Sequence, residues 1–92
     1  MIRVRLIIEG RVQGVFYRVY TREEAEKNGI KGWVRNLHTG EVEVVAEGEE
    51  KSVKKLIAWC KKGPPHANVK NVKIIQEEYI GESDSFSISY KL

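Results

Sequence analysis

Apolar and polar residues alternate along much of this chain. Residues 2–8 alternate apolar side chains with Arg3 and Arg5, the period-2 pattern of a strand with one buried face, and Gly10 ends the run. Strand patterns bounded by turn residues recur in four further segments. These segments are residues 30–36, 41–47, 69–78 and 86–90. The pattern therefore predicts five strands, the last of them short.

In two segments, the spacing between apolar residues lengthens to that of a helix. The first runs from Tyr17 to Asn28-Gly29, a pair that suits a left-handed helix cap. The second begins after the acidic pair Glu49-Glu50, and Gly63 ends it before two prolines that forbid continuation. Its apolar positions follow the spacing i, i+3, i+4, i+7: Val53, Leu56, Ile57 and Cys60.

The order strand-helix-strand-strand-helix-strand predicts an α+β fold, the ferredoxin-like split β-α-β-β-α-β sandwich. In it, two helices cover one face of an antiparallel sheet, here with a short extra C-terminal strand. A right-handed crossover makes strands 2–8 and 30–36 parallel, with strand 41–47 between them. Their C-terminal ends then lie at the same end of the sheet. We therefore expect the loop after Glu9 to converge with Asn36.

Composition narrows the class of protein. A chain of 92 residues, 41% hydrophobic and 32% charged, fits one globular domain, which we place at residues 1–92. Cys60 is the only cysteine, so no disulfide can form within the chain. No apolar run could span a bilayer, and we expect a cytoplasmic protein with no membrane partner. The net charge of +3 favours anionic partners.

The segment from Gly10 to Arg18, GRVQGVFYR, joins a strand to a helix. A loop at this position presents unpaired backbone N–H groups at the positive end of a helix dipole. Gly10 and Gly14 permit close backbone approach, and the guanidinium of Arg18 can donate two hydrogen bonds to phosphate oxygens. These features suit a phosphoryl group. The alternative from this segment alone is an ordinary glycine-containing connection with a solvated arginine.

Asn36 adds a second group at the same end of the sheet. Its amide has a donor and an acceptor, so it could orient a water molecule while N–H donors hold a phosphate. The alternative is an asparagine that favours the turn after it.

Three segments in order resemble the acylphosphatase family: residues 10–18, residues 32–36 (GWVRN) and residues 63–69 (GPPHANV). The resemblance covers essentially the whole chain. It implies a metal-independent hydrolase acting on acid anhydrides in phosphorus-containing compounds, with no cofactor. Its substrate would be an acyl phosphate, cleaved to carboxylate and inorganic phosphate, and the phosphate would also inhibit competitively. We expect a monomer.

The resemblance also implies site residues. Arg18 would bind the phosphate with a loop made of Gln13, Gly14, Val15, Phe16, Tyr17 and Arg18, and Asn36 would orient the attacking water. Arg18 and Asn36 are thus the predicted catalytic residues. Tyr17 departs from the phenylalanine usual before the arginine, and could place a hydroxyl near the site.

Two other functions remain as alternatives. A noncatalytic phosphate- or anion-binding module would keep the same loop, although retention of both Arg18 and Asn36 argues against lost turnover. An RNA-binding module of the same fold would stack bases on strand aromatics, and residues 41–47 have none and carry acidic side chains instead. We therefore expect no nucleic-acid partner.

The other chemically capable side chains have ordinary interpretations. Cys60 completes the apolar face of the second helix, which indicates packing. His38 and His66 stand alone, so solvated positions are expected and no metal site is predicted. Trp33 and Trp59 are expected to pack.

Overall fold

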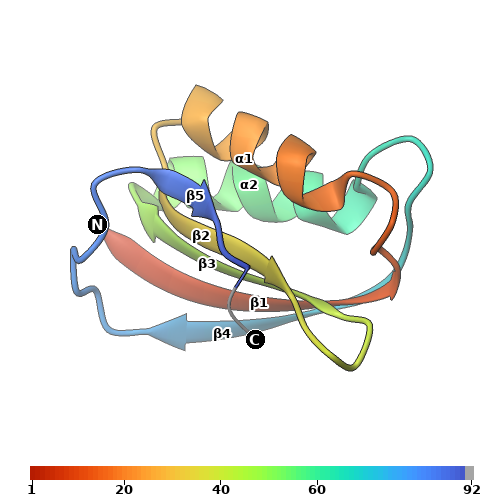
Figure 1. Cartoon of the computed structure of the whole chain (residues 1–92). Helices are drawn as coiled ribbons and strands as arrows, with labels where there is room; N and C mark the ends of the chain where they lie inside the picture. Colours follow the sequence, from red (N-terminus) through yellow and green to blue (C-terminus); the bar gives the residue numbers. More distant parts are fainter. Residues whose placement is uncertain (91–92) are drawn as a thin grey trace.

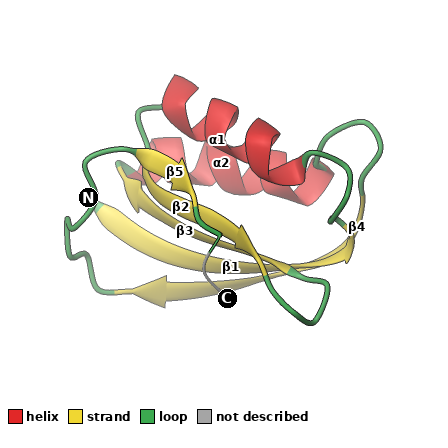
Figure 2. Ribbon diagram, in the orientation of Figure 1, coloured by secondary structure: helices red, strands yellow, loops and turns green. Residues whose placement is uncertain are grey.

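The computed structural model describes residues 1–90, in which two helices lie side by side on one face of a five-stranded sheet (Figure 1, Figure 2). The elements are β1 (Ile2–Arg11), α1 (Tyr17–Lys27), β2 (Lys31–Asn36), β3 (Val42–Gly48), α2 (Glu50–Lys62), β4 (Asn68–Glu77) and β5 (Phe86–Ile88). Their order and the placement of both helices confirm the predicted ferredoxin-like fold.

The sheet order is β4-β1-β3-β2-β5. β3 pairs antiparallel with both β1 and β2, so the C-terminal ends of β1 and β2 point the same way. This confirms the predicted convergence of the loop after β1 with Asn36. β5 pairs parallel with β2, and the sheet is therefore mixed rather than wholly antiparallel.

The bounds of β2, β3 and β4 differ from the sequence expectation by one residue, and those of β1 and β5 differ by more. β1 continues through Gly10 to Arg11, with a shift in register between Glu9 and Gly10. Gly10 has a φ of 127°, and a Cβ there would overlap the backbone of Asn68, so the close approach of β4 requires glycine. β5 ends at Ile88, which leaves Tyr90 beyond the sheet.

The apolar core lies between the helices and the covered face of the sheet. Alternate residues of β1 and β3 supply its floor, among them Leu6, Ile8 and Val44, each fully buried. Val53, Leu56 and Cys60 of α2 close it from above, as their helical spacing predicts. Cys60 is thus a packing residue, and burial raises the pKa of its thiol to about 12.

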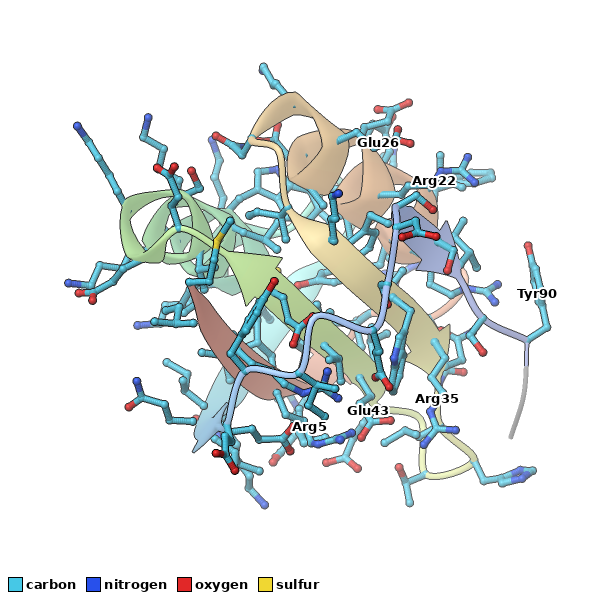
Figure 3. The ribbon with its side chains drawn as sticks, turned by 90° about the vertical axis from the view of Figure 1, so that its left-hand side faces the viewer. Arg5, Arg22, Glu26, Arg35, Glu43 and Tyr90 are labelled. Atoms are coloured by element: carbon cyan, nitrogen blue, oxygen red, sulfur yellow. The ribbon has the colours of Figure 1, made fainter. Side chains whose placement is uncertain are left out.

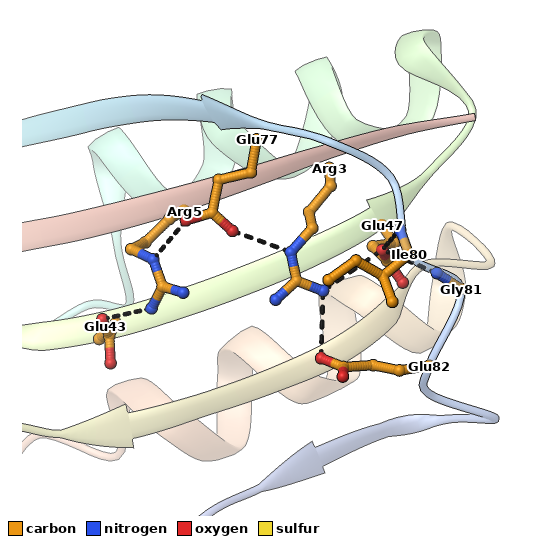
Figure 4. A network of polar contacts seen from close by, with 8 residues as sticks. All are labelled: Arg3, Arg5, Glu43, Glu47, Glu77, Ile80, Gly81 and Glu82. Atoms are coloured by element: carbon orange, nitrogen blue, oxygen red, sulfur yellow. Dashed lines mark hydrogen bonds and ion pairs between the residues drawn. The ribbon is translucent and has the colours of Figure 1, made fainter.

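The face of the sheet turned away from the helices carries a layer of ion pairs, shown in Figure 4. Arg3 contacts Glu47 at 3.3 Å and Glu77 at 2.9 Å. Arg5 contacts Glu77 at 2.7 Å and Glu43 at 2.6 Å. Arg3, Glu43 and Glu47 are almost fully buried, although simple alternation would leave them exposed.

Candidate active site

Three buried side chains anchor the loop between β1 and α1 to the core. Val12, Val15 and Tyr17 are buried in the core, and Gly14 and Phe16 between them face outward. Both outward residues have left-handed backbones, with φ 77° at Gly14 and φ 62° at Phe16. A left-handed phenylalanine is uncommon and costs conformational energy, so the surrounding packing must impose this loop shape.

The loop ends at an uncapped helix N-terminus. Phe16 is the N-cap of α1 and makes no side-chain capping hydrogen bond, and the first turn carries no acidic residue. Within residues 1–90, no backbone N–H of residues 13–18 donates to another backbone or side-chain group. These N–H groups and the positive helix end form an electropositive concavity that suits an anion.

A cavity of about 210 Å³ lies against this loop. It brings together the residues that the sequence placed apart, because Arg18 from α1 and Asn36 from the end of β2 both line it. The remaining lining residues are Val12, Gln13, Gly14, Phe16, Tyr17, Val19, Ile88 and Tyr90.

Arg18 is half-buried at the wall of the cavity. Its guanidinium carbon lies 5.2 Å from the centroid of the Tyr90 ring, and no carboxylate of residues 1–90 forms an ion pair with it. Tyr90 stands apart beyond the end of β5 (Figure 3) and is 76% exposed. The guanidinium therefore retains its hydrogen-bond donors for an oxyanion.

Asn36 is the last residue of β2 and pairs with Val42 across the hairpin. The hairpin turn after it is closed by Leu37 N–H donating to Glu41 O at 2.8 Å. This pairing fixes the backbone on which the half-buried Asn36 side chain sits, at the edge of the cavity.

The family model described as Acylphosphatase matches residues 4–88. The chain belongs to the acylphosphatase family. An acylphosphatase of Rubrobacter xylanophilus is 51% identical over 86 residues, which make up 94% of this chain and 78% of that protein. One of Syntrophus aciditrophicus is 48% identical over 90 residues, or 98% of this chain and 94% of that protein.

The fold agrees with the family. The crystal structure of acylphosphatase from Bacillus subtilis superposes with a TM-score of 0.94 at 36% identity, covering 98% of this chain and all of that one. Family, fold and relatives of nearly full length support an acylphosphatase activity, a hydrolysis of acid anhydrides, and do not favour the noncatalytic and RNA-binding alternatives.

The open face of the acylphosphatase sheet, where an RNA-binding module of this fold would stack bases, carries charged side chains around Trp33. Arg5, Arg35 and Glu43 lie together on that face (Figure 3), and Arg35 contacts Glu43 at 2.6 Å. The Trp33 ring is flanked by the guanidinium groups of Arg5 and Arg35, at 5.9 and 5.2 Å. Of the acidic side chains of residues 41–47, Glu43 and Glu47 are buried in ion pairs with arginines, and Glu41 accepts a hydrogen bond from Thr39.

The sequence analysis allowed the hydroxyl of Tyr17 to lie near the acylphosphatase site, but the structure places it elsewhere. Tyr17 Oη donates to the carbonyl oxygen of Cys60 at 2.7 Å inside the interface between the helices. Burial raises the pKa of this phenol far above its ordinary value. The ring also packs on Trp59, with centroids 5.6 Å apart.

Sequence reasoning missed several residues around the acylphosphatase cavity. Ile88 and Tyr90 reach it because β5 pairs parallel with β2, and no short-range pattern predicts that pairing. Phe16 was expected in the loop, but neither its left-handed backbone nor its 74% exposure was. A phenylalanine directly before a helix is not by itself a signal for a left-handed backbone or for an exposed side chain.

His38 and His66 are exposed, and the half-buried Trp33 and Trp59 pack on neighbouring side chains. In residues 1–90, no three His, Cys, Asp or Glu side chains come together as a metal site requires. Neither described helix is long and apolar enough to cross a bilayer.

Proposed function

We propose that this chain hydrolyses acyl phosphates in the cavity between the β1–α1 loop and the end of β2. The N–H groups of residues 13–18 and the guanidinium of Arg18 hold the phosphoryl oxygens, and the Asn36 amide orients the attacking water. The observation that carries the proposal is the shared cavity, which collects unpaired N–H donors, an arginine without a carboxylate partner in residues 1–90, and the amide.

The chemistry needs little beyond positioning and charge stabilisation. The water oxygen bonds to phosphorus, the bond from phosphorus to the acyl oxygen breaks, and the carboxylate leaves with the electron pair. Both protons of the water remain on the phosphate product. Because a carboxylic acid has a pKa near 4, the leaving group requires no protonation at neutral pH. The N–H groups and Arg18 stabilise the charge on the equatorial oxygens, a contribution that usually dominates phosphoryl transfer.

Arg18→Ala tests the proposed role of Arg18 in binding the phosphate and stabilising its charge. Loss of a charged donor aimed at the reacting oxygens typically costs about 3 kcal/mol, so turnover should fall at least about 100-fold and phosphate affinity should fall with it. The measurement is hydrolysis of an aryl acyl phosphate, with excess chelator present and inorganic phosphate as competitor. Arg22→Ala is the matched control, since Arg22 is one turn further along α1 and does not line the cavity. Near-normal turnover by Arg18→Ala would contradict the assignment.

Asn36→Ala tests the water-orienting group separately. Turnover should fall about 100-fold, because a mispositioned nucleophile loses much of the benefit of orientation, while inhibition by inorganic phosphate stays nearly unchanged. Asn71→Ala, in the exposed part of β4, is the matched control. A large loss of phosphate inhibition in Asn36→Ala would assign Asn36 to substrate binding instead.

The proposal includes small carboxyl phosphates as substrates, with inorganic phosphate as both product and competitive inhibitor. The cytoplasmic location, the monomeric state and the extent of the domain over residues 1–92 remain predictions from the sequence.

A further inference from the structure

The Gln13 side chain extends from the phosphate loop, residues 13–18 between β1 and α1, to the β2–β3 hairpin. Its Nε2 donates to the carbonyl oxygen of Leu37 at 2.9 Å and to that of Glu41 at 2.8 Å. An amide nitrogen carries two hydrogens, so both are used and neither is available to a phosphate. We propose that Gln13 is a positioning residue, which sets the distance between the phosphate-binding N–H groups of residues 13–18 and Asn36.

The two acceptors are the closing residues of the hairpin turn that begins directly after Asn36. Leu37 O also accepts from Gly40 N–H at 3.2 Å, and Glu41 O also accepts from Leu37 N–H at 2.8 Å. Each carbonyl has two lone pairs, so one can serve the turn and the other Gln13. The Gln13 amide therefore holds the turn at the residue that follows Asn36.

The sheet does not provide this connection by itself. β1 and β2 are separated by β3, so no strand hydrogen bond joins the phosphate loop to Asn36 directly. Within residues 1–90, the two Gln13 bonds are the hydrogen bonds that link residues 12–18 to residues 36–41. One side chain therefore provides the direct hydrogen bonds between the phosphate-binding loop and the turn beside Asn36 within residues 1–90.

Substitutions that keep the size of the Gln13 side chain test its hydrogen-bond donors without changing its volume. Gln13→Met fills a similar volume and donates nothing. Gln13→Glu has nearly the same shape, but its carboxylate faces two carbonyl oxygens and can donate only when protonated. Thr39→Ala is the matched control, because Thr39 lies in the same turn, is exposed, and donates its hydroxyl hydrogen bond to the Glu41 side chain.

The inference rests on the proposed function, so the first measurement is steady-state hydrolysis of an aryl acyl phosphate by wild type and the three variants. We expect kcat to fall about 10- to 100-fold in Gln13→Met and Gln13→Glu, since small misplacements of reacting groups cost that much. Inhibition by inorganic phosphate should change less than about threefold, because the N–H groups and Arg18 remain. Thr39→Ala should match wild type, and thermal melting should show that all variants are folded at the assay temperature.

A pH profile distinguishes positioning from a general loss of stability. The kcat of Gln13→Glu relative to wild type should rise as pH falls through the titration of the new carboxyl, because the protonated form regains one donor. The relative kcat of Gln13→Met should stay flat. A kcat within twofold of wild type in Gln13→Met, or phosphate inhibition lost as strongly as kcat, would overturn the inference alone. Absence of turnover by wild type would overturn the proposed function as well.

Discussion

The hydroxyl group of Tyr17 forms a hydrogen bond between the two helices of this protein. The carbonyl of Cys60 belongs to the last turn of α2, where carbonyl groups have no partner within the helix, and the Tyr17 hydroxyl donates to it from the start of α1. This bond fixes the first residue of α1, and hence the end of the phosphate loop, against the core.

Tyr17→Phe should lower the free energy of unfolding by about 1 to 3 kcal/mol, because it leaves a buried carbonyl without a donor. Urea denaturation at neutral pH measures the change. Tyr20→Phe is the matched control, since Tyr20 is in the same helix and partly exposed, and it should change stability little. Equal stability of Tyr17→Phe and wild type would mean that the bond contributes nothing net.

At the scale of elements, the position of β2 decides where Asn36 lies. Gly32 in β2 has a φ of 139°, and a Cβ at this residue would overlap the carbonyl oxygen of Val45 in β3. The close approach of these two strands therefore requires a residue without a side chain, four residues before the predicted water-orienting group.

Gly32→Ala should destabilise the protein by about 3 kcal/mol or more, because it combines an unfavourable backbone conformation with a backbone overlap. The control is Gly29→Ala, where φ is 68° and nothing lies within 4 Å of the added Cβ, so only about 1 to 2 kcal/mol of backbone strain is expected. Thermal unfolding compares the two variants. Similar melting temperatures would show that β2 can move away from β3 without cost.

At the scale of the whole molecule, the ion pairs of the open sheet face join β1, β2, β3 and β4 to one another and to Glu82 in the loop after β4. Burial raises the pKa of the Glu47 carboxyl, but N–H groups of Ile80 and Gly81 together with Arg3 outweigh it, so its pKa lies below the ordinary value of 4.5. Hydrogen bonds from Arg5 and Arg3 lower the pKa of Glu77 in the same way.

Carboxyl groups with a lowered pKa stabilise the folded state fully above their unfolded-state pKa, and that stability is lost as pH falls through the folded-state pKa. Wild-type stability should therefore decrease as pH falls below about 4.5. Glu47→Gln should be about 2 to 3 kcal/mol less stable at pH 7, because Arg3 loses a buried partner, and should depend less on pH. Urea midpoints from pH 7 to pH 3 test this, with the exposed Glu26→Gln (Figure 3) as control. Parallel pH profiles for wild type and Glu47→Gln would contradict it.

The sequence by itself determined the elements and their order, because period-2 and helical spacing, with glycines and prolines at the boundaries, are local signals. The rule of right-handed crossovers then placed the β1–α1 loop beside Asn36. The same nine-residue segment made Arg18 a candidate phosphate-binding residue, because it places a permanently charged donor in the first turn of a helix after a glycine-containing loop. The segment alone also allowed a solvated arginine, and the resemblance to acylphosphatases gave Arg18 its predicted catalytic role.

Only the tertiary structure decided how individual side chains are used. The Gln13 amide and the Tyr17 hydroxyl point to carbonyls 24 and more residues away, and either could equally have faced the phosphate. The burial of Arg3, Glu43 and Glu47 depends on charges from distant strands that meet on one sheet face. The parallel pairing of β5 brings Tyr90 to the cavity. Each of these is a contact between segments far apart in the chain, and the spacing of residues along the sequence carries no information about such contacts.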